Sequence, residues 1–157
     1  MSASSFAVCL VRADNRWLAS RFDLAAPEKF VQAAAAHVAG LRSEGPALAL
    51  AAIEDDFFVI IRPQPGGAKL YISDALAATY DDYAQAVLDA MDAEVPEVDN
   101  IDDADPWPDG DDDILSDLGL SDQVLDVIAG DADAWASEQI DQILEELGVD
   151  ASLDAIR

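Results

Sequence analysis

The feature that most constrains the fold is a set of short apolar segments, each bounded by turn residues. The segment 47–53 is apolar at nearly every position, and Glu54, Asp55 and Asp56 separate it from the next apolar segment. Short apolar segments between turn signals are typical of buried strands. The predicted strands are residues 6–12, 17–22, 47–53, 57–61 and 69–72.

Two helices are predicted among these strands. Pro27 suits the first turn of a helix, and apolar residues recur at helical spacing over residues 30–41. A second helix is predicted from Asp81 to Met91. The order is therefore β-β-α-β-β-β-α, and the short connections between strands require antiparallel neighbours. We expect an α+β domain over residues 1–93 with an antiparallel five-stranded sheet, as in the longin, profilin and roadblock-like folds, which mostly serve as interaction modules.

The charge distribution divides the chain after residue 93. Residues 1–93 hold 12 acidic and 7 basic residues, a net charge of −5, whereas residues 94–157 hold 21 acidic residues and one basic residue, a net charge of −20. We expect residues 94–113 to form an acidic linker, because its prolines and like charges disfavour regular structure. Residues 114–157 regain helical periodicity and are expected to form an acidic all-α segment with Trp135 in its core. Its short amphipathic helices must bury their apolar stripes in each other, in the first domain or in a partner.

The net charge of −25 limits the possible partners. So acidic a chain repels nucleic-acid phosphates and anionic membranes, so we expect neither as a direct partner. A basic protein surface or metal ions are favoured, and solubility is the alternative reason for the charge. A single cysteine, no signal-peptide pattern and no apolar stretch near the roughly 20 residues of a membrane span indicate a cytoplasmic protein.

The residue patterns of common catalytic and metal sites are missing from the sequence. A zinc deaminase needs H-x-E and P-C-x-x-C segments, but His37 is not followed by such a Glu, and Cys9 is the one cysteine. An EF-hand loop starting at Asp105 fails at Trp107 and at Ser116. We therefore expect no catalytic residue, no cofactor and no metal, and we expect Cys9 to pack in the core. An enzyme that uses carboxylates in a cleft of the first domain remains a further hypothesis.

The candidate partner-binding residues lie in the acidic linker; they are Trp107, Asp109, Asp111, Asp112 and Asp113. Trp107 stands between two prolines in an acidic segment, where exposing its ring to water is costly. It either folds back onto the first domain or anchors a partner, since Trp is favoured at binding hot spots. The aspartates would face a basic surface.

Four segments carry a family resemblance; they are Phe6–Arg12, Glu54–Arg62, Tyr71–Ala75 and the acidic linker leading to Asp113–Leu120. Together they resemble the tRNA adenosine deaminase-associated proteins of actinobacteria. The resemblance implies a neighbour or partner of the deaminase, the zinc enzyme whose motifs are absent here, and it implies no activity of its own. The chain would be a non-catalytic accessory or regulatory protein whose acidic C-terminal part occupies a basic surface of the enzyme. The alternative is a nucleic-acid mimic or immunity-type inhibitor of another nucleic-acid-acting protein.

Overall fold

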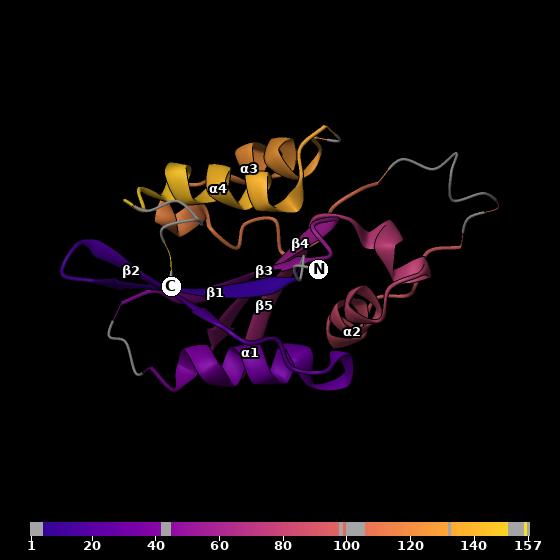
Figure 1. Ribbon diagram of the computed structural model, residues 1–157, viewed down its shortest axis with the longest axis horizontal. Coiled ribbons are helices and arrows are strands. Elements are labelled where there is room, and N and C mark those ends of the chain that lie inside the picture. Colours follow the sequence, from indigo (N-terminus) through magenta and orange to yellow (C-terminus); the bar gives the residue numbers. More distant parts are fainter. Residues whose placement is uncertain are drawn as a thin grey trace.

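A central antiparallel sheet organises the protein, with helices on both of its faces (Figure 1). The computed structural model describes residues 5–41, 45–97, 99, 106–131, 133–150 and 156. The strands are β1 (Phe6–Ala13), β2 (Arg16–Phe22), β3 (Ala47–Ile53), β4 (Phe57–Gln64), β5 (Gly67–Ile72) and β6 (Asp109–Gly110). Their order across the sheet is β2-β1-β3-β4-β5-β6. The predicted α+β class with an antiparallel sheet is therefore confirmed.

Tight turns join the strands of the first two hairpins. Asp14 and Asn15 connect β1 to β2 with φ angles of 52° and 65°, and Glu54 and Asp55 connect β3 to β4 with φ angles of 54° and 53°. The first turn has two residues, both with positive φ, and the second has three, Glu54, Asp55 and Asp56, of which the first two have positive φ. A two-residue turn with positive φ at both positions matches the twist of the flanking strands. The turns thereby fix which residues face each other along the strands.

Side chains of the central strands alternate between two hydrophobic cores, one on each face of the sheet. In β1, Ala7 and Cys9 face one core, whereas Val8 and Leu10 face the other, and all four are almost completely buried. The burial of Cys9 confirms its predicted place in the core. Strands buried on both faces consist of nearly continuous apolar residues, because neither set of alternate positions meets water.

One face of the sheet is covered by the helices that lie within the first 93 residues. They are η1 (Pro27–Lys29), α1 (Phe30–Ala39), η2 (Ala75–Thr79) and α2 (Asp82–Ala90). In α1, Phe30, Ala34 and Val38 point into the core. Asp81 caps α2 by accepting hydrogen bonds from the backbone of Tyr83 and Ala84, which satisfies donors that have no partner within the helix.

The opposite face is covered by the acidic C-terminal segment (Figure 1, top). Its helices are η4 (Ser116–Leu118), α3 (Asp122–Ala129) and α4 (Ala136–Leu147). Ile140, Ile143 and Leu144 of α4 are buried in the same core as Leu50 and Ile60 of the sheet. We call the described residues from 111 to 150 the C-terminal layer. Among the helices of the described residues, none is both long and apolar enough to cross a membrane.

The sheet has six strands, so the predicted number of five is wrong. The additional strand, β6, lies inside the predicted acidic linker and places Gly110 opposite Tyr71. Gly110 has a φ of 109°, and a Cβ atom there would lie 2.3 Å from the carbonyl oxygen of Leu70. Only glycine allows this close approach of two backbones. A strand of two residues has no detectable periodicity, so the sequence pattern could not reveal it.

The expectation that Trp135 lies in the core is also wrong, since the residue is 64% exposed. Trp135 is the residue before α4, with extended backbone angles of −72° and 157°. It therefore lies outside the helical periodicity, and Ala136 and Ile140 occupy the buried positions instead.

Candidate functional site: an acidic helical layer held against the sheet

Arg62 on β4 joins the acidic segment to the sheet. Its Nη1 donates hydrogen bonds to Oδ1 of Asp117 at 2.6 Å and to the carbonyl oxygen of Ile114 at 2.8 Å, and its Nη2 donates to Oδ2 of Asp117 at 2.8 Å. Two parallel bonds between a guanidinium and a carboxylate fix orientation as well as distance. The hydrogen bond from Arg62 lowers the pKa of the Asp117 carboxyl, which therefore stays charged.

The turn between β3 and β4 caps the N-terminus of α4. The carbonyl oxygen of Asp55 accepts a hydrogen bond from the amide of Ala136 at 3.2 Å, and its Oδ1 accepts one from the amide of Ser137 at 2.7 Å. The first amides of a helix lack partners within the helix and favour a negative charge. Asp55 thus provides acceptors for the first amides of α4, a helix that begins 81 residues further along the chain.

Two aromatic residues of the sheet also bind the C-terminal layer. The Tyr71 hydroxyl donates to Oδ1 of Asp126 at 2.9 Å, and Nε1 of Trp17 donates to the carbonyl oxygen of Leu147 at 3.0 Å. Burial, the hydrogen bond to Asp126 and the nearby charges of Asp126 and Asp112 raise the pKa of Tyr71. Tyr71 therefore remains a neutral donor, and each helix of the layer has a polar anchor as well as apolar contacts.

The aspartates of the predicted partner-binding set lie in or just after β6, beside β5, and are exposed. The Asp111 amide donates to the carbonyl oxygen of Leu70 at 2.8 Å, while its Oδ2 accepts from the Leu70 amide at 3.2 Å. Asp113 lies 3.5 Å from Nζ of Lys69. Asp109 accepts a hydrogen bond from the adjacent amide of Gly110. Part of this acidic segment therefore holds the edge of the sheet in place.

Trp107 and Asp112 complete that set. The carbonyl oxygen of Trp107 accepts a hydrogen bond from the amide of Ala75 at 2.8 Å, which fixes its backbone beside η2, yet the residue is 37% exposed. Asp112 is exposed and influences Tyr71 through its charge. The backbone of Trp107 is thus held against the first 93 residues, while part of the side chain stays open to water.

The surface of the C-terminal layer is negatively charged. Its exposed carboxylate residues include Asp117, Asp122, Glu138, Glu145 and Glu146. The sequence contains no Lys, Arg or His between residues 70 and 156. Arg62 and Lys69 of the sheet form salt bridges to this layer, with Asp117 and Asp113 respectively.

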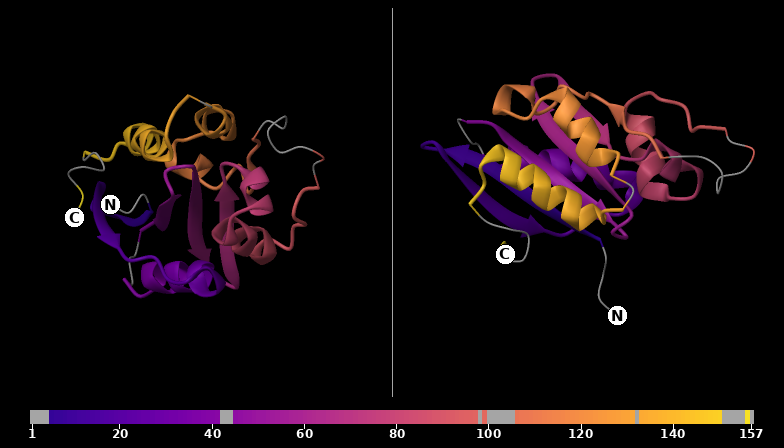
Figure 2. Two further views of the ribbon diagram at one scale, coloured as in Figure 1. Left: turned by 45° about the vertical axis from the view of Figure 1, so that its right-hand side comes forward. Right: turned by 90° about the horizontal axis from the view of Figure 1, so that it is seen from above.

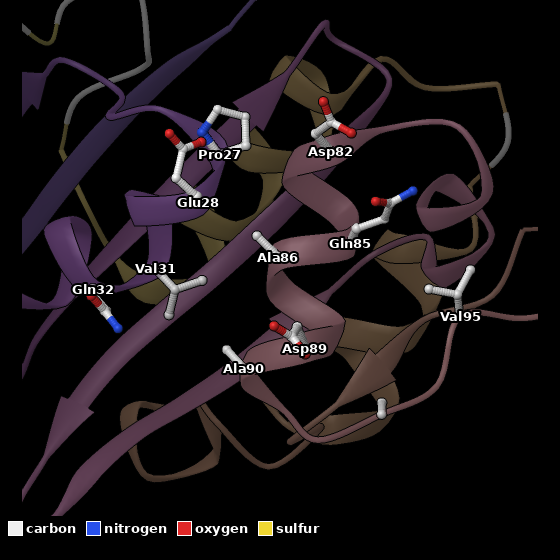
Figure 3. A pocket seen from close by; sticks show the side chains of 11 residues that line it. Pro27, Glu28, Val31, Gln32, Asp82, Gln85, Ala86, Asp89, Ala90 and Val95 are labelled. Atoms are coloured by element: carbon white, nitrogen blue, oxygen red, sulfur yellow. The ribbon is translucent and has the colours of Figure 1, made fainter.

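A groove of about 690 Å³ lies on the other side of the sheet, between η1 and α1 on one wall and α2 on the other (Figure 3). Glu28, Asp82 and Asp89 place carboxylates around it, and Val31 and Val95 add apolar surface. A smaller groove of about 420 Å³ lies between α3 and α4. Both grooves are lined by acidic and apolar side chains.

The one cysteine and the one histidine of the sequence both take part in packing. Within the described residues, no group of three or more His, Cys, Asp or Glu is arranged to hold a metal ion. Burial raises the pKa of Cys9 to about 11, so its thiol is neutral at neutral pH. The His37 ring stacks on Phe22 with 4.3 Å between ring centroids.

Several residues that position this layer were not found from the sequence. The sequence contained a hint for Arg62, because this residue is one of few basic residues and directly follows the predicted strand 57–61. The capping role of Asp55 had no local signal, since its partners Ala136 and Ser137 are distant in sequence.

Comparison with known proteins places the chain among relatives. The family model described as Rv3753c-like tRNA adenosine deaminase-associated protein matches residues 5–150, which include the sheet and both helical layers. Protein Rv3753c of Mycobacterium tuberculosis (strain ATCC 25618 / H37Rv) is 41% identical over 151 residues, covering 96% of this chain and 86% of that protein. No solved structure matches the chain significantly. The resemblance drawn from the four sequence segments is confirmed.

Proposed function

The chain belongs to the family of Rv3753c-like tRNA adenosine deaminase-associated proteins, and we propose that it is a non-catalytic accessory or regulatory protein of a tRNA adenosine deaminase. In this proposal it acts in the cytoplasm and binds a basic surface of the enzyme through its acidic C-terminal part, residues 94–157. The family description supports the association with the deaminase. The charge and the packing of the C-terminal layer support the mode of contact.

The observation that carries this proposal is an acidic surface on a folded layer. The exposed carboxylates of α3 and α4 are held by helices packed on the sheet, and no basic residue occurs in the sequence from residue 70 to residue 156. A preformed surface loses less conformational entropy on binding than a disordered tail of the same charge. Complementary charge also speeds encounter with a basic partner and disfavours acidic ones.

The expected consequence is competition with tRNA. An enzyme that binds tRNA must present Lys and Arg to the phosphates, and the acidic layer can occupy the same surface. The linker residues Trp107, Asp109 and Asp111–Asp113 would extend this contact along the β6 edge of the sheet. Occupation of that surface would protect the enzyme before substrate arrives or would restrain its access to other nucleic acids.

Calorimetric titration of the full chain with the tRNA adenosine deaminase of the same organism tests the proposal. We expect binding at low salt that weakens as salt rises, because the attraction is between charges. A variant carrying Asp122→Asn, Glu138→Gln, Glu145→Gln and Glu146→Gln should bind more weakly. A matched variant with Glu28→Gln, Asp82→Asn and Asp89→Asn on the other side of the sheet is the control. No heat of binding at low salt would reject the proposal.

The same acidic layer supports a second candidate, a nucleic-acid mimic that inhibits a different nucleic-acid-acting protein. The two candidates differ in their target. The second predicts inhibition of a protein other than the deaminase, relieved by adding tRNA or DNA as competitor. If the activity of a tested nucleic-acid-acting protein does not change when the chain is added, that protein is excluded as the target.

A further inference from the structure

Helix α3 carries apolar side chains on two of its sides. Leu125, Ile128 and Ala129 face the core between the layer and the sheet. Val124 is 38% exposed and Val127 is 73% exposed. Residues three positions apart lie on the same side of a helix, so the two valines form one apolar surface. A helix with a single core face ordinarily carries polar residues elsewhere, so this surface requires an explanation.

The two valines lie on one wall of the α3–α4 groove, the space of about 420 Å³ between these helices. The other wall is provided by Gln142, Glu145 and Glu146 of α4. Both glutamates are exposed, and in the part of the chain that the structure describes neither forms a salt bridge. Seen from above the sheet, α3 and α4 lie next to each other as its outer covering (Figure 2, right). The groove therefore joins an apolar wall to an anionic wall.

We propose that the α3–α4 groove binds a basic amphipathic helix of a partner protein. The apolar side chains of that helix contact Val124 and Val127, and its Lys or Arg side chains reach Glu145 and Glu146. Binding of an amphipathic helix in a groove, through apolar residues at helical spacing, is a common mode of recognition. The identification of this partner as the deaminase rests on the function proposed above. The chemistry of the groove does not depend on that proposal.

Charge complementarity selects this occupant over the alternatives. Residues 70–156 contain no Lys, Arg or His, so this stretch of the chain cannot supply the matching cations. A second copy of the same layer would bring carboxylates against carboxylates. Nucleic acid and anionic lipid would be repelled in the same way. A helix with Lys or Arg beside an apolar stripe satisfies both walls at once.

Nuclear magnetic resonance of valine methyl groups in the full chain tests the proposal with a defined probe. The probe is a synthetic helical peptide with Leu at positions i, i+3, i+4 and i+7 and Lys beside that stripe; a matched peptide carries Glu in place of Lys. We expect the Lys peptide to shift the methyl signals of Val124 and Val127 and the Glu peptide to shift neither. Shifts at Val31 and Val95, which line the groove between α1 and α2, would place the peptide there and overturn the proposal.

Variants make the test quantitative. Val127→Lys should weaken binding of the Lys peptide by about tenfold or more, and the side chain is exposed enough that folding should be unaffected. Glu145→Gln with Glu146→Gln should weaken binding and reduce its salt dependence. Asp82→Asn with Asp89→Asn should change nothing. Equal affinity of all these variants would contradict the proposal.

The same variants separate this inference from the proposed function. If the deaminase binds the unmodified chain and the Val127→Lys chain equally, the groove assignment is wrong, although the association stands. If the Lys peptide binds in the groove while the deaminase does not bind the chain, the groove assignment stands and the proposed function is wrong.

Discussion

Arg62 and Asp117, which are 55 residues apart in the chain, form a two-pronged ion pair with nitrogen–oxygen distances of 2.6 and 2.8 Å. The same guanidinium also bonds the carbonyl oxygen of Ile114. One side chain of the sheet thus binds both a backbone carbonyl and a carboxylate in the first part of the C-terminal layer. The acidic surface available to a partner depends on such intramolecular contacts.

Removal of this anchor should destabilise the protein. Arg62→Ala leaves the carbonyl of Ile114 and the carboxylate of Asp117 without their donor, and we expect a loss of about 1–2 kcal/mol, reduced by the exposure of Asp117. Urea unfolding followed by circular dichroism measures it. Arg16→Ala, at an exposed position on β2, is the control and should have no effect. Identical midpoints for both variants would show that the ion pair does not matter for stability.

The same pair predicts how stability depends on pH. Arg62 lowers the pKa of Asp117 below its ordinary value of 3.8, so folding favours the charged form. The stabilisation is complete above the unfolded pKa and is lost as the pH falls through the lower, folded pKa. Between about pH 5 and pH 3, the unfolding free energy of the unmodified protein should therefore fall more than that of Asp117→Asn. Parallel curves for the two proteins would contradict this.

The cap on α4 can be tested without disturbing the turn that provides it. Asp55 has a φ of 53°, which glycine adopts without strain, so Asp55→Gly removes the carboxylate without straining the backbone. We expect a loss of about 1 kcal/mol and faster hydrogen exchange at the amide of Ser137. Asp55→Asn keeps an acceptor and tolerates positive φ, so it should resemble the unmodified protein. Unchanged exchange at Ser137 in Asp55→Gly would argue against the cap.

The sixth strand depends on a single glycine. Gly110→Ala would place a Cβ atom 2.3 Å from the carbonyl oxygen of Leu70 at a backbone angle that favours glycine. We expect β6 to separate from β5, with faster hydrogen exchange at the Asp111 amide. Gly67→Ala is the matched control, because nothing lies within 4 Å of a Cβ atom there. Protection of the Asp111 amide that is the same in both variants would disprove this role.

The antiparallel sheet and the helix caps could be predicted because their signals are local. Asp81 precedes α2 and caps it, and Gly148 follows α4 with a φ of 83°, which are standard start and stop residues. The packing of the acidic helices on the sheet could also have been predicted, from consecutive apolar residues within single strands. Leu48 and Ala49, like Ile60 and Ile61, are consecutive buried residues that face opposite cores, so a second covering layer was required.

What could not be predicted depends on contacts between distant residues. β6 consists of two residues that pair with Tyr71 and Ile72 of β5. Asp55 caps α4, which begins far along the chain. Trp135 is exposed because it lies one residue before the first turn of α4. In a helix, a shift of one position turns a side chain by about 100° around the axis, and helix boundaries predicted from sequence are not that accurate.

In the function proposed above, the C-terminal layer binds a basic surface of the deaminase. The most direct measurement is the salt dependence of the dissociation constant for the full chain and the deaminase, compared between the unmodified protein and the variant with Asp122, Glu138, Glu145 and Glu146 neutralised. We expect tight binding at low salt for the unmodified protein, and weaker binding with a shallower salt dependence for the variant. Equal affinity and equal salt dependence of the two proteins would contradict the claim.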